Sequence, residues 1–215
     1  MIRDLPRPAF IAAVRADFTG QRLPISKLRR AYALAEQSVG VRHGTEALQK
    51  ALCVHVGTLR LLQQQLEKVE NALLSIFFGL RPAPYLLSVP DLGEITAAII
   101  LAEIGDPSRY SNASQLIKLA GTQPVPNTSG RKTRSKTPMS RKGRPRLRTA
   151  LYFAVMRLIQ TDDNFARVYR RFRTRDKNPL TRMQALGALM NKLLRILWAL
   201  MKHQTFYDPT YEMSS

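Results

Sequence analysis

Apolar residues recur at helical spacing along nearly the whole chain, and the alternation typical of strands is almost absent. Residues 7–18 and 25–38 predict two short helices, separated by a break at Gly20 and Pro24. A long uninterrupted helical pattern follows, roughly from residue 44 to 80. The pattern therefore predicts an all-α protein.

The long pattern has apolar positions that step alternately by three and four residues, which is the heptad repeat of a coiled coil. From its middle onward this seam consists of Leu59, Leu62, Leu66, Val69, Leu73, Ile76 and Leu80, and traced backwards it reaches His55, Leu52 and Leu48. We expect a coiled-coil-like helical arm over 44–82 that ends at Pro82 and Pro84. Residues 44–80 would pair with a second helix, from the same chain or from a partner subunit in a homo-oligomer.

A compact helical domain is expected over 83–206, between an N-terminal part, 1–43, and a tail, 207–215. Its start resembles a helix-hairpin-helix, because an apolar residue, a short turn with Gly93 and a small-residue helix follow one another. In such a motif the turn holds a DNA phosphate at a helix N-terminus. The usual pattern has glycine at the position of Asp91, so a plain helical turn in the core is the alternative.

Four further helices are expected in this domain. Ser111 is placed to cap a short helix that ends near Gly121. After a long polar loop, 121–143, a helix begins at Pro145. A basic helix spans 164–174, and a final helix opens at Asn178-Pro179 and reaches His203. The expected buried face of the final helix consists of Met183, Leu186, Leu189, Met190, Leu193, Leu194, Leu197 and Leu200.

Charge indicates the class of partner. The 215 residues carry 34 Lys and Arg against 15 Asp and Glu, a formal net charge of +19. Such an excess destabilises a folded chain by self-repulsion unless a polyanion is near, and nucleic acid is the first candidate. Anionic membranes and ribosomal RNA are the other partners that charge alone allows. The single cysteine, Cys53, excludes an intramolecular disulfide and is expected to be a small buried hydrophobe.

Localisation is expected to be cytoplasmic, in a bacterium. The first residues do not resemble a signal peptide, because Arg3, Asp4 and Arg7 interrupt any apolar run. No apolar stretch is as long as a membrane span, so no membrane partner is expected.

The strongest local signal is a basic segment that contains no acid. It comprises Arg131, Lys132, Arg134, Lys136, Arg141, Lys142, Arg144, Arg146 and Arg148. Cations this dense repel one another unless phosphates lie between them, so phosphate binding is favoured over a solvated charge run. A second basic band is expected to extend the same surface: Arg167, Arg170, Arg171, Arg173, Arg175 and Lys177.

Ser129 lies within this segment, next to Gly130. A serine hydroxyl can attack phosphorus when its proton is removed and the phosphoryl charge is neutralised. Neighbouring arginines supply the second condition, and Gly130 permits close approach of a DNA backbone. No histidine is near in sequence to act as a base, and a turn serine is the alternative.

Several ordered motifs resemble the DEDD-type insertion-sequence transposases, the recombinases guided by a bridge RNA. The runs 88–98 and 101–106 are similar to the opening of the C-terminal domain of that family, and 38–44 to its linker. Further similarities follow in order: 116–121 to the "QLxxxAG" helix, Ser129-Gly130 to the serine–glycine pair, 139–143 to the "SKRG" turn, Leu147-Arg148 to "LR", and 192–194 to "KLL".

The resemblance implies a role for two serines. Ser129 matches the family's catalytic serine, which joins covalently to a DNA end during strand exchange. Ser140, before Arg141-Lys142-Gly143, is interpreted as a turn or phosphate-contacting residue. The implied partners are DNA and a guide RNA.

The chain departs from the family pattern in one respect. The family carries a RuvC-like domain ahead of the coiled coil, with four acidic residues that hold divalent metal, and nothing here matches it. Magnesium is therefore expected only in that missing domain, and neither cofactor nor metal in this chain. We expect a truncated chain, a decayed reading frame or half of a split system, unable to perform the serine chemistry alone. A non-catalytic nucleic-acid-binding module and a dimerising remnant that interferes with a full-length transposase are the alternatives.

Overall fold

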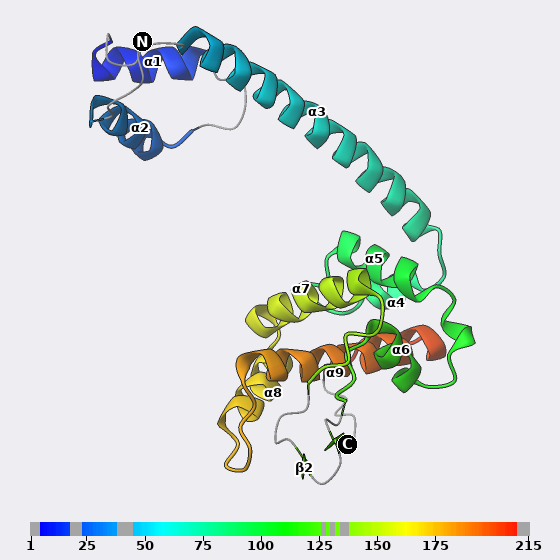
Figure 1. Cartoon of the computed structure of the whole chain (residues 1–215). Coiled ribbons are helices and arrows are strands. Elements are labelled where there is room, and N and C mark those ends of the chain that lie inside the picture. Colours follow the sequence, from blue (N-terminus) through cyan, green and yellow to red (C-terminus); the bar gives the residue numbers. More distant parts are fainter. Residues whose placement is uncertain are drawn as a thin grey trace. The chain divides into compact units, whose positions relative to one another are not determined.

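The computed structural model of the chain describes residues 5–17, 23–37, 45–125, 128–129, 132–133 and 138–209. The chain divides into two compact units, Met1–Leu62 and Gln63–Ser215. Within the described residues the regular structure is helical, apart from two strands of two residues each. The predicted all-α class is confirmed (Figure 1).

The first unit contains α1, Arg7–Asp17, and α2, Ile25–Gln37, each within one residue of its predicted end. Phe10 and Tyr32 hold the two helices together, with ring centroids 5.7 Å apart. The Tyr32 hydroxyl also donates a hydrogen bond to the Leu5 carbonyl, at 3.0 Å. This small aromatic contact accounts for the burial of Phe10 and Tyr32.

The long helix α3 spans Thr45–Phe78, as the heptad pattern predicts. The expectation that Pro82 and Pro84 end it is wrong. The helix ends before them, where the N–H groups of Gly79 and Leu80 bond to carbonyls three residues back. Pro82 instead caps the next helix, α4 (Ala83–Leu87), and Pro84 lies in its first turn, where a proline needs no N–H partner.

Most of the apolar seam of α3 is exposed. Leu59, Leu62 and Leu66 are 56–57% exposed. Cys53 is exposed as well, so the expectation of a buried cysteine is wrong. Only the last turns of the helix contribute to a core, because Phe77 is 2% exposed and Leu73 packs beside it in the second unit. The heptad face thus lacks a partner in the described part of the chain.

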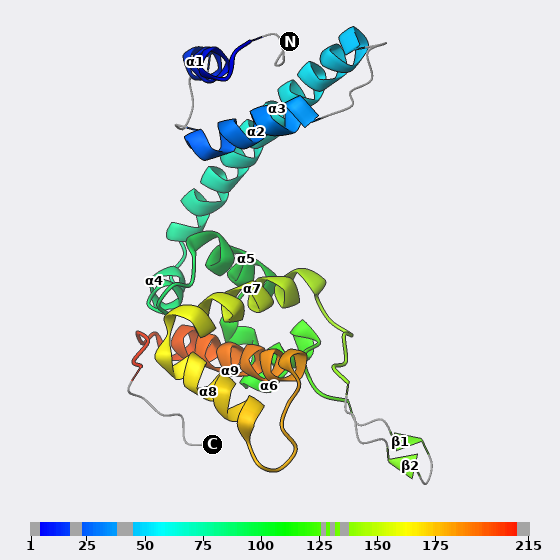
Figure 2. The ribbon, with the colours of Figure 1, turned by 90° about the vertical axis from the view of Figure 1, so that its left-hand side faces the viewer.

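The second unit is a packed group of helices. After α4 come α5 (Glu94–Ile104), the 3-10 turn η2 (Pro107–Arg109), α6 (Ala113–Ala120), α7 (Pro145–Thr161), α8 (Asp163–Thr174) and α9 (Arg182–His203). Helix α7 contacts α5, α8 and α9, and α9 also contacts α4, α6 and η2. Helices α7 and α9 therefore form the centre of the unit, with the shorter helices around them (Figures 1 and 2).

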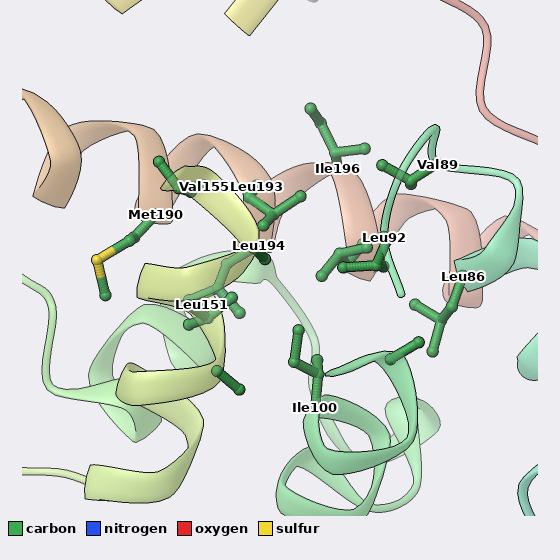
Figure 3. Packing of buried hydrophobic residues seen from close by; sticks show 14 of the residues in the cluster. Leu86, Val89, Leu92, Ile100, Leu151, Val155, Met190, Leu193, Leu194 and Ile196 are labelled. Carbon is green, nitrogen blue, oxygen red and sulfur yellow. The ribbon is translucent and has the colours of Figure 1, made fainter. Parts of the chain in front are cut away.

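The core consists of branched aliphatic side chains from these helices. Figure 3 shows Leu151 and Val155 of α7 against Leu193 and Leu194 of α9, all four of them fully buried. The predicted buried face of α9 is confirmed from Leu186 onward. Within the described residues, no helix combines the length and apolar character that a membrane crossing needs.

Helices α4 and α5, with the turn between them, occupy the position of the predicted helix-hairpin-helix-like start. Asp91, where the usual pattern has glycine, adopts a left-handed backbone with φ of +57°. Gly93 caps α5, and Leu92 is buried in the core. The Asp91 carboxylate lies 3.5 Å from the guanidinium of Arg157 on α7. The hairpin thus keeps a glycine-like backbone at Asp91, while its apolar residues serve core packing.

Two helix starts differ from the expectation. Asn112, not Ser111, caps α6, because its side chain accepts a hydrogen bond from the Gln115 N–H. Helix α9 begins at Arg182 rather than at Asn178-Pro179, because Thr181 and Gln184 form a reciprocal capping box. As a consequence Met183, expected on the buried face, lies in the first turn and is 62% exposed.

Candidate nucleic-acid interface

The long polar loop is closed at its base by an antiparallel stem. Residues 121–125 leave the C-terminus of α6, and residues 138–144 return to the N-terminus of α7. The backbone hydrogen bonds of the stem, 2.8–2.9 Å long, are Val125 N–H to Pro138 O, Ser140 N–H to Gln123 O, Arg141 N–H to Gly121 O and Arg144 N–H to Leu119 O. The stem thus fixes the two ends of the basic loop, one at the C-terminus of α6 and the other at the N-terminus of α7.

Two glycines allow the stem to close. Gly121 ends α6 with a left-handed backbone, φ +67°, which glycine adopts without steric cost. Gly143 lies directly on this helix end. A Cβ atom on Gly143 would stand 2.5 Å from the Leu119 oxygen and 2.7 Å from the Ala120 carbonyl carbon, and closer still to the Gly121 nitrogen. Close backbone approach therefore requires glycine at position 143.

The stem is also attached to α9. Asn191 donates a side-chain hydrogen bond to the Thr122 carbonyl, at 3.3 Å. The methyl end of Met139 lies against Gly187, where an added Cβ would stand 3.0 Å from it. Thr122 itself is 2% exposed. The two strands of the stem are therefore held against the central helix of the unit.

Ser129 lies in a short β-hairpin beyond the stem. Strand β1 (Thr128–Ser129) pairs antiparallel with β2 (Lys132–Thr133). In this register Ser129 is the partner of Lys132, so the candidate nucleophile and one predicted phosphate ligand are neighbours on adjacent strands. Arg131, Arg134 and Lys136 lie outside the described residues.

Four of the described cations of the segment are exposed beside the stem: Arg141, Lys142, Arg144 and Arg146. Arg141 has a left-handed backbone, φ +55°, at the turn that leads into α7. The Ser140 hydroxyl accepts a hydrogen bond from the Lys142 N–H, at 3.2 Å, so Ser140 is a turn residue, as one of its two interpretations has it. The N-terminus of α7 begins immediately afterwards, at Pro145.

Two of the predicted phosphate ligands also bind the protein itself. Arg144 donates to the Glu103 carbonyl at the end of α5 and lies 3.7 Å from the Glu103 carboxylate. Arg148 donates from Nη1 to the Ala120 carbonyl at the end of α6, at 2.9 Å. Both guanidinium groups therefore hold the base of the loop against α5 and α6. Each has further N–H groups that can donate to a phosphate.

The second basic band lies on and after α8. This helix buries Phe165 and Val168 and turns its arginines outward. Arg173 in the last turn of α8 and Arg175 just after the helix are also structural. Arg173 donates to the Leu180 carbonyl and Arg175 to the Asn178 carbonyl, at 2.7 and 2.6 Å. These two arginines thus shape the turn into α9.

In the part of the chain that the structure describes, no three His, Cys, Asp or Glu side chains are grouped so that they could hold a metal ion. These residues therefore do not fit a two-metal site.

Several residues of this interface escaped the sequence analysis. Thr122, Gly143, Gly187 and Asn191 hold the stem in place, and none of them carries charge. A polar Asn191 within the apolar pattern of α9 was the available signal, because a half-buried amide needs a hydrogen-bond partner.

Comparison with protein families gives one match. Residues 83–170 match the model described as the transposase IS116/IS110/IS902 family. The matched segment begins with α4, includes the stem and the Ser129 hairpin, and ends within α8.

Curated proteins with similar sequences come from mobile elements and from a DNA-inverting system. The chain is 28% identical to the 43.6 kDa protein of insertion element IS110 of Streptomyces coelicolor, over 82% of this chain and 42% of that protein. It is 35% identical to the 42 kDa protein of insertion element IS900 of Mycobacterium paratuberculosis, over 60% and 32%. A pilin gene-inverting protein of Moraxella bovis is 29% identical, over 59% and 38%. The matches thus span less than half of each of these relatives.

Proposed function

We propose that residues 83–170, which match the IS116/IS110/IS902 transposase family model, form a domain of that family, and that the protein binds DNA and acts in DNA transposition or site-specific recombination. One observation carries the proposal: the matched segment contains a stem that bears a basic cluster at its base and leads to the hairpin with Ser129. We define the basic cluster as Arg141, Lys142, Arg144, Arg146 and Arg148. The similarity to a protein of an insertion element and to a pilin gene-inverting protein is consistent with it.

The proposed chemistry is a transesterification at a DNA phosphodiester. Ser129 Oγ attacks phosphorus and forms a phosphoserine ester, while the bond from phosphorus to one deoxyribose oxygen breaks. The proton of the serine hydroxyl is balanced by the proton that the leaving sugar oxygen takes up. One ester bond replaces another, so the step needs no external energy source. Cations around the phosphoryl oxygens stabilise the charge that develops there.

Phosphate binding is proposed for the exposed part of the basic cluster. Arg141, Lys142 and Arg146 lie beside the N-terminus of α7, and helix N-termini favour anions. Arg144 and Arg148 hold the loop in place and add charge at the same end. The cluster thus positions a DNA backbone against the hairpin without reading its bases.

The resemblance implies two further components. A RuvC-like domain with its magnesium ions and a guide RNA are proposed to act together with the serine segment. Because the described residues do not fit such a metal site, the chain is proposed to depend on that domain for strand exchange.

DNA binding is expected to depend steeply on salt through the basic cluster. Replacing Arg141, Lys142 and Arg146 together with glutamine should reduce the slope of log K against log salt by roughly two to three, because each lost phosphate contact removes about 0.9. The measurement is fluorescence anisotropy of a labelled duplex across a salt series. A matched control removes the same charges from α2, where Lys27, Arg29 and Arg30 are exposed. Equal slopes for the two variants would contradict the assignment, and weak, salt-independent binding of the wild type would contradict nucleic-acid binding itself.

The exposed seam of α3 favours a second proposal, self-association through residues 44–80. Leu59, Leu62 and Leu66 follow the heptad spacing and are all more than half exposed, so a second copy of the same helix is the proposed partner. Burial of such a leucine contributes about 1.5–3 kcal/mol relative to exposure.

Disrupting the seam should therefore separate the subunits. Changing Leu59 and Leu66 to glutamate is expected to weaken the dimer at least about a hundredfold, measured by light scattering after gel filtration across a concentration series. The control changes Gln63 and Gln64, in the outward positions, to glutamate. A wild-type chain that is monomeric at high concentration would refute the proposal.

A further inference from the structure

The second unit has a cavity. Its lining residues lie between Asn164 and Arg171 on α8, between Lys192 and His203 on α9, and in residues 205–209. Its volume is about 860 Å³. That size falls within the range of about 300–1,000 Å³ typical of small-molecule sites. None of the residues of the basic cluster lines it. In Figure 2 α9 runs from the side of the unit that carries the hairpin to the opposite side, where its C-terminal end lies. The cavity is therefore separate from the stem and the basic cluster, although Arg167 and Arg171 of its lining belong to the second basic band.

The charged side chains around the cavity favour an anion. Arg167 and Arg171 come from α8 and Lys192 from α9, while Asp208 is the one carboxylate in the lining. Arg171 lies on the exposed side of its helix, with its guanidinium carbon 6.0 Å from the Phe172 ring centroid. A planar guanidinium suits a phosphate, because it can donate two parallel hydrogen bonds.

Aromatic rings lie in the same lining as these cations. Phe206 lines the cavity and is 66% exposed, although it is a large apolar side chain. Tyr85 contacts it at a centroid distance of 5.4 Å and an angle of 57°, so the ring is held while much of its surface remains open. Trp198 also lines the cavity and is half-buried. Rings held in this way are surfaces on which a nucleobase can stack.

The segment that carries Phe206 is fixed on both sides. The N–H of Tyr207 donates to the Ser88 hydroxyl, at 2.8 Å. Asn164 at the start of α8 donates to the Pro209 carbonyl, at 2.6 Å. Burial, followed by the nearby Asp162 carboxylate, raises the pKa of the Tyr207 hydroxyl above its usual range, as expected for a side chain packed onto the unit. Residues 205–209 are thus held in place by the rest of the unit and form one wall of the cavity.

We propose that this cavity binds an unstacked nucleotide of a single-stranded nucleic acid, with Phe206 stacking on the base and Arg167 and Arg171 contacting its phosphate. Stacking tolerates any base, so the site holds a strand without selecting a sequence. The inference rests on the proposed function only in that nucleic acid is the partner, and it is independent of Ser129. It gives the protein a second contact for a strand that has left the duplex.

The single tryptophan provides the test, because Trp198 lies in the cavity lining. The intact chain is titrated with an oligodeoxythymidylate, and in a parallel arm with an oligouridylate of equal length, while tryptophan fluorescence is recorded. Saturable quenching is expected. A higher affinity in one arm identifies whether DNA or RNA supplies the nucleotide, and no saturable quenching in either arm would overturn the proposal.

Substitutions of cavity-lining residues distinguish binding at this site from general electrostatic attraction to a basic protein. Phe206→Ala should weaken the quenching titration about tenfold or more, whereas Phe206→Tyr, which keeps a ring, should behave like the wild type. Arg171→Gln should weaken it about threefold or more. Its control is Arg170→Gln, an exposed arginine on the same helix that does not line the cavity. Thermal melting confirms that each variant folds. Equal effects of the two arginine changes, or unchanged affinity in Phe206→Ala, would overturn the proposal.

Failure of the cavity proposal can be distinguished from failure of the proposed function. Substitution of Arg141, Lys142 and Arg146 should leave the quenching titration within about twofold, because these residues do not line the cavity. Loss of the quenching effect together with retained, salt-dependent duplex binding would refute the cavity site alone. Absence of both would refute nucleic-acid binding altogether.

Discussion

Replacing Ser129 with alanine is expected to abolish covalent attachment of the protein to DNA, while the affinity for DNA stays within about twofold. The hydroxyl oxygen is the only atom removed, and a nucleophile that forms the covalent intermediate has no substitute on the same side chain. Loss of such a nucleophile lowers the rate of the chemical step by at least about a thousandfold. Phosphate contacts come from other residues, so binding should persist.

The measurement is a denaturing gel with end-labelled DNA, in which a covalent complex migrates more slowly than free DNA. One lane contains the chain alone, and a parallel lane adds a RuvC-like partner domain and a guide RNA. Ser140→Ala is the control, because Ser140 is a turn residue a few positions away whose hydroxyl accepts from the Lys142 N–H. An adduct that persists in Ser129→Ala would disprove the assignment. Steep DNA binding without an adduct in any lane would favour the non-catalytic module.

The helices of this protein could be predicted from sequence because their signals are local. An apolar face, a cap and a break lie within a few residues of one another, so α1, α2 and α3 agree closely with their predicted bounds, and α7 begins at the predicted residue. The errors also have local causes. Asn178-Pro179 looked like a helix start, but the capping box of Thr181 and Gln184 places it three residues later.

The stem could not be predicted, because its contacts join residues far apart in the chain. Pairing of 121–125 with 138–144 has no apolar alternation that would indicate strands. The contact between Thr122 and Asn191 spans 69 residues. A run of arginines likewise predicts charge without telling which guanidinium groups bind the protein. The Arg148 side chain donates to the Ala120 carbonyl, whereas Arg141 is exposed beside the stem, although both were expected to bind phosphate.

The fold explains how a long polar loop could position the serine that we propose as the nucleophile. A loop of this length would otherwise sample many conformations, at a large entropic cost on ordering. Here the stem joins the ends of α6 and α7 before the hairpin begins, and Arg144 and Arg148 connect the same point to α5 and α6. Catalysis by a serine requires such positioning, because small displacements of reacting atoms are costly.

Replacing Gly143 with alanine should therefore prevent covalent attachment to DNA as removal of the Ser129 hydroxyl does, by a different route. The new methyl group would meet backbone atoms of Leu119, Ala120 and Gly121 at 2.7 Å or less, and backbone cannot rotate away as a side chain can. We expect a loss of about 2–4 kcal/mol of unfolding free energy, or local opening of the stem with loss of the covalent adduct. Thermal melting measures the first outcome. Hydrogen exchange at the Ser140 and Arg141 amides measures the second, because both donate to the opposite side of the stem.

Gly93→Ala is the matched control within the same unit. Gly93 has φ of −59° and open space where a Cβ would lie, so alanine should cost no more than about 1 kcal/mol there, the size of a lost helix-cap preference. If the two variants melt alike and exchange alike, the close approach of Gly143 to α6 does not hold the stem. If only Gly143→Ala accelerates exchange at Ser140 and Arg141 and also loses the adduct, the position of the serine depends on a backbone contact that carries no charge and takes no part in the chemistry.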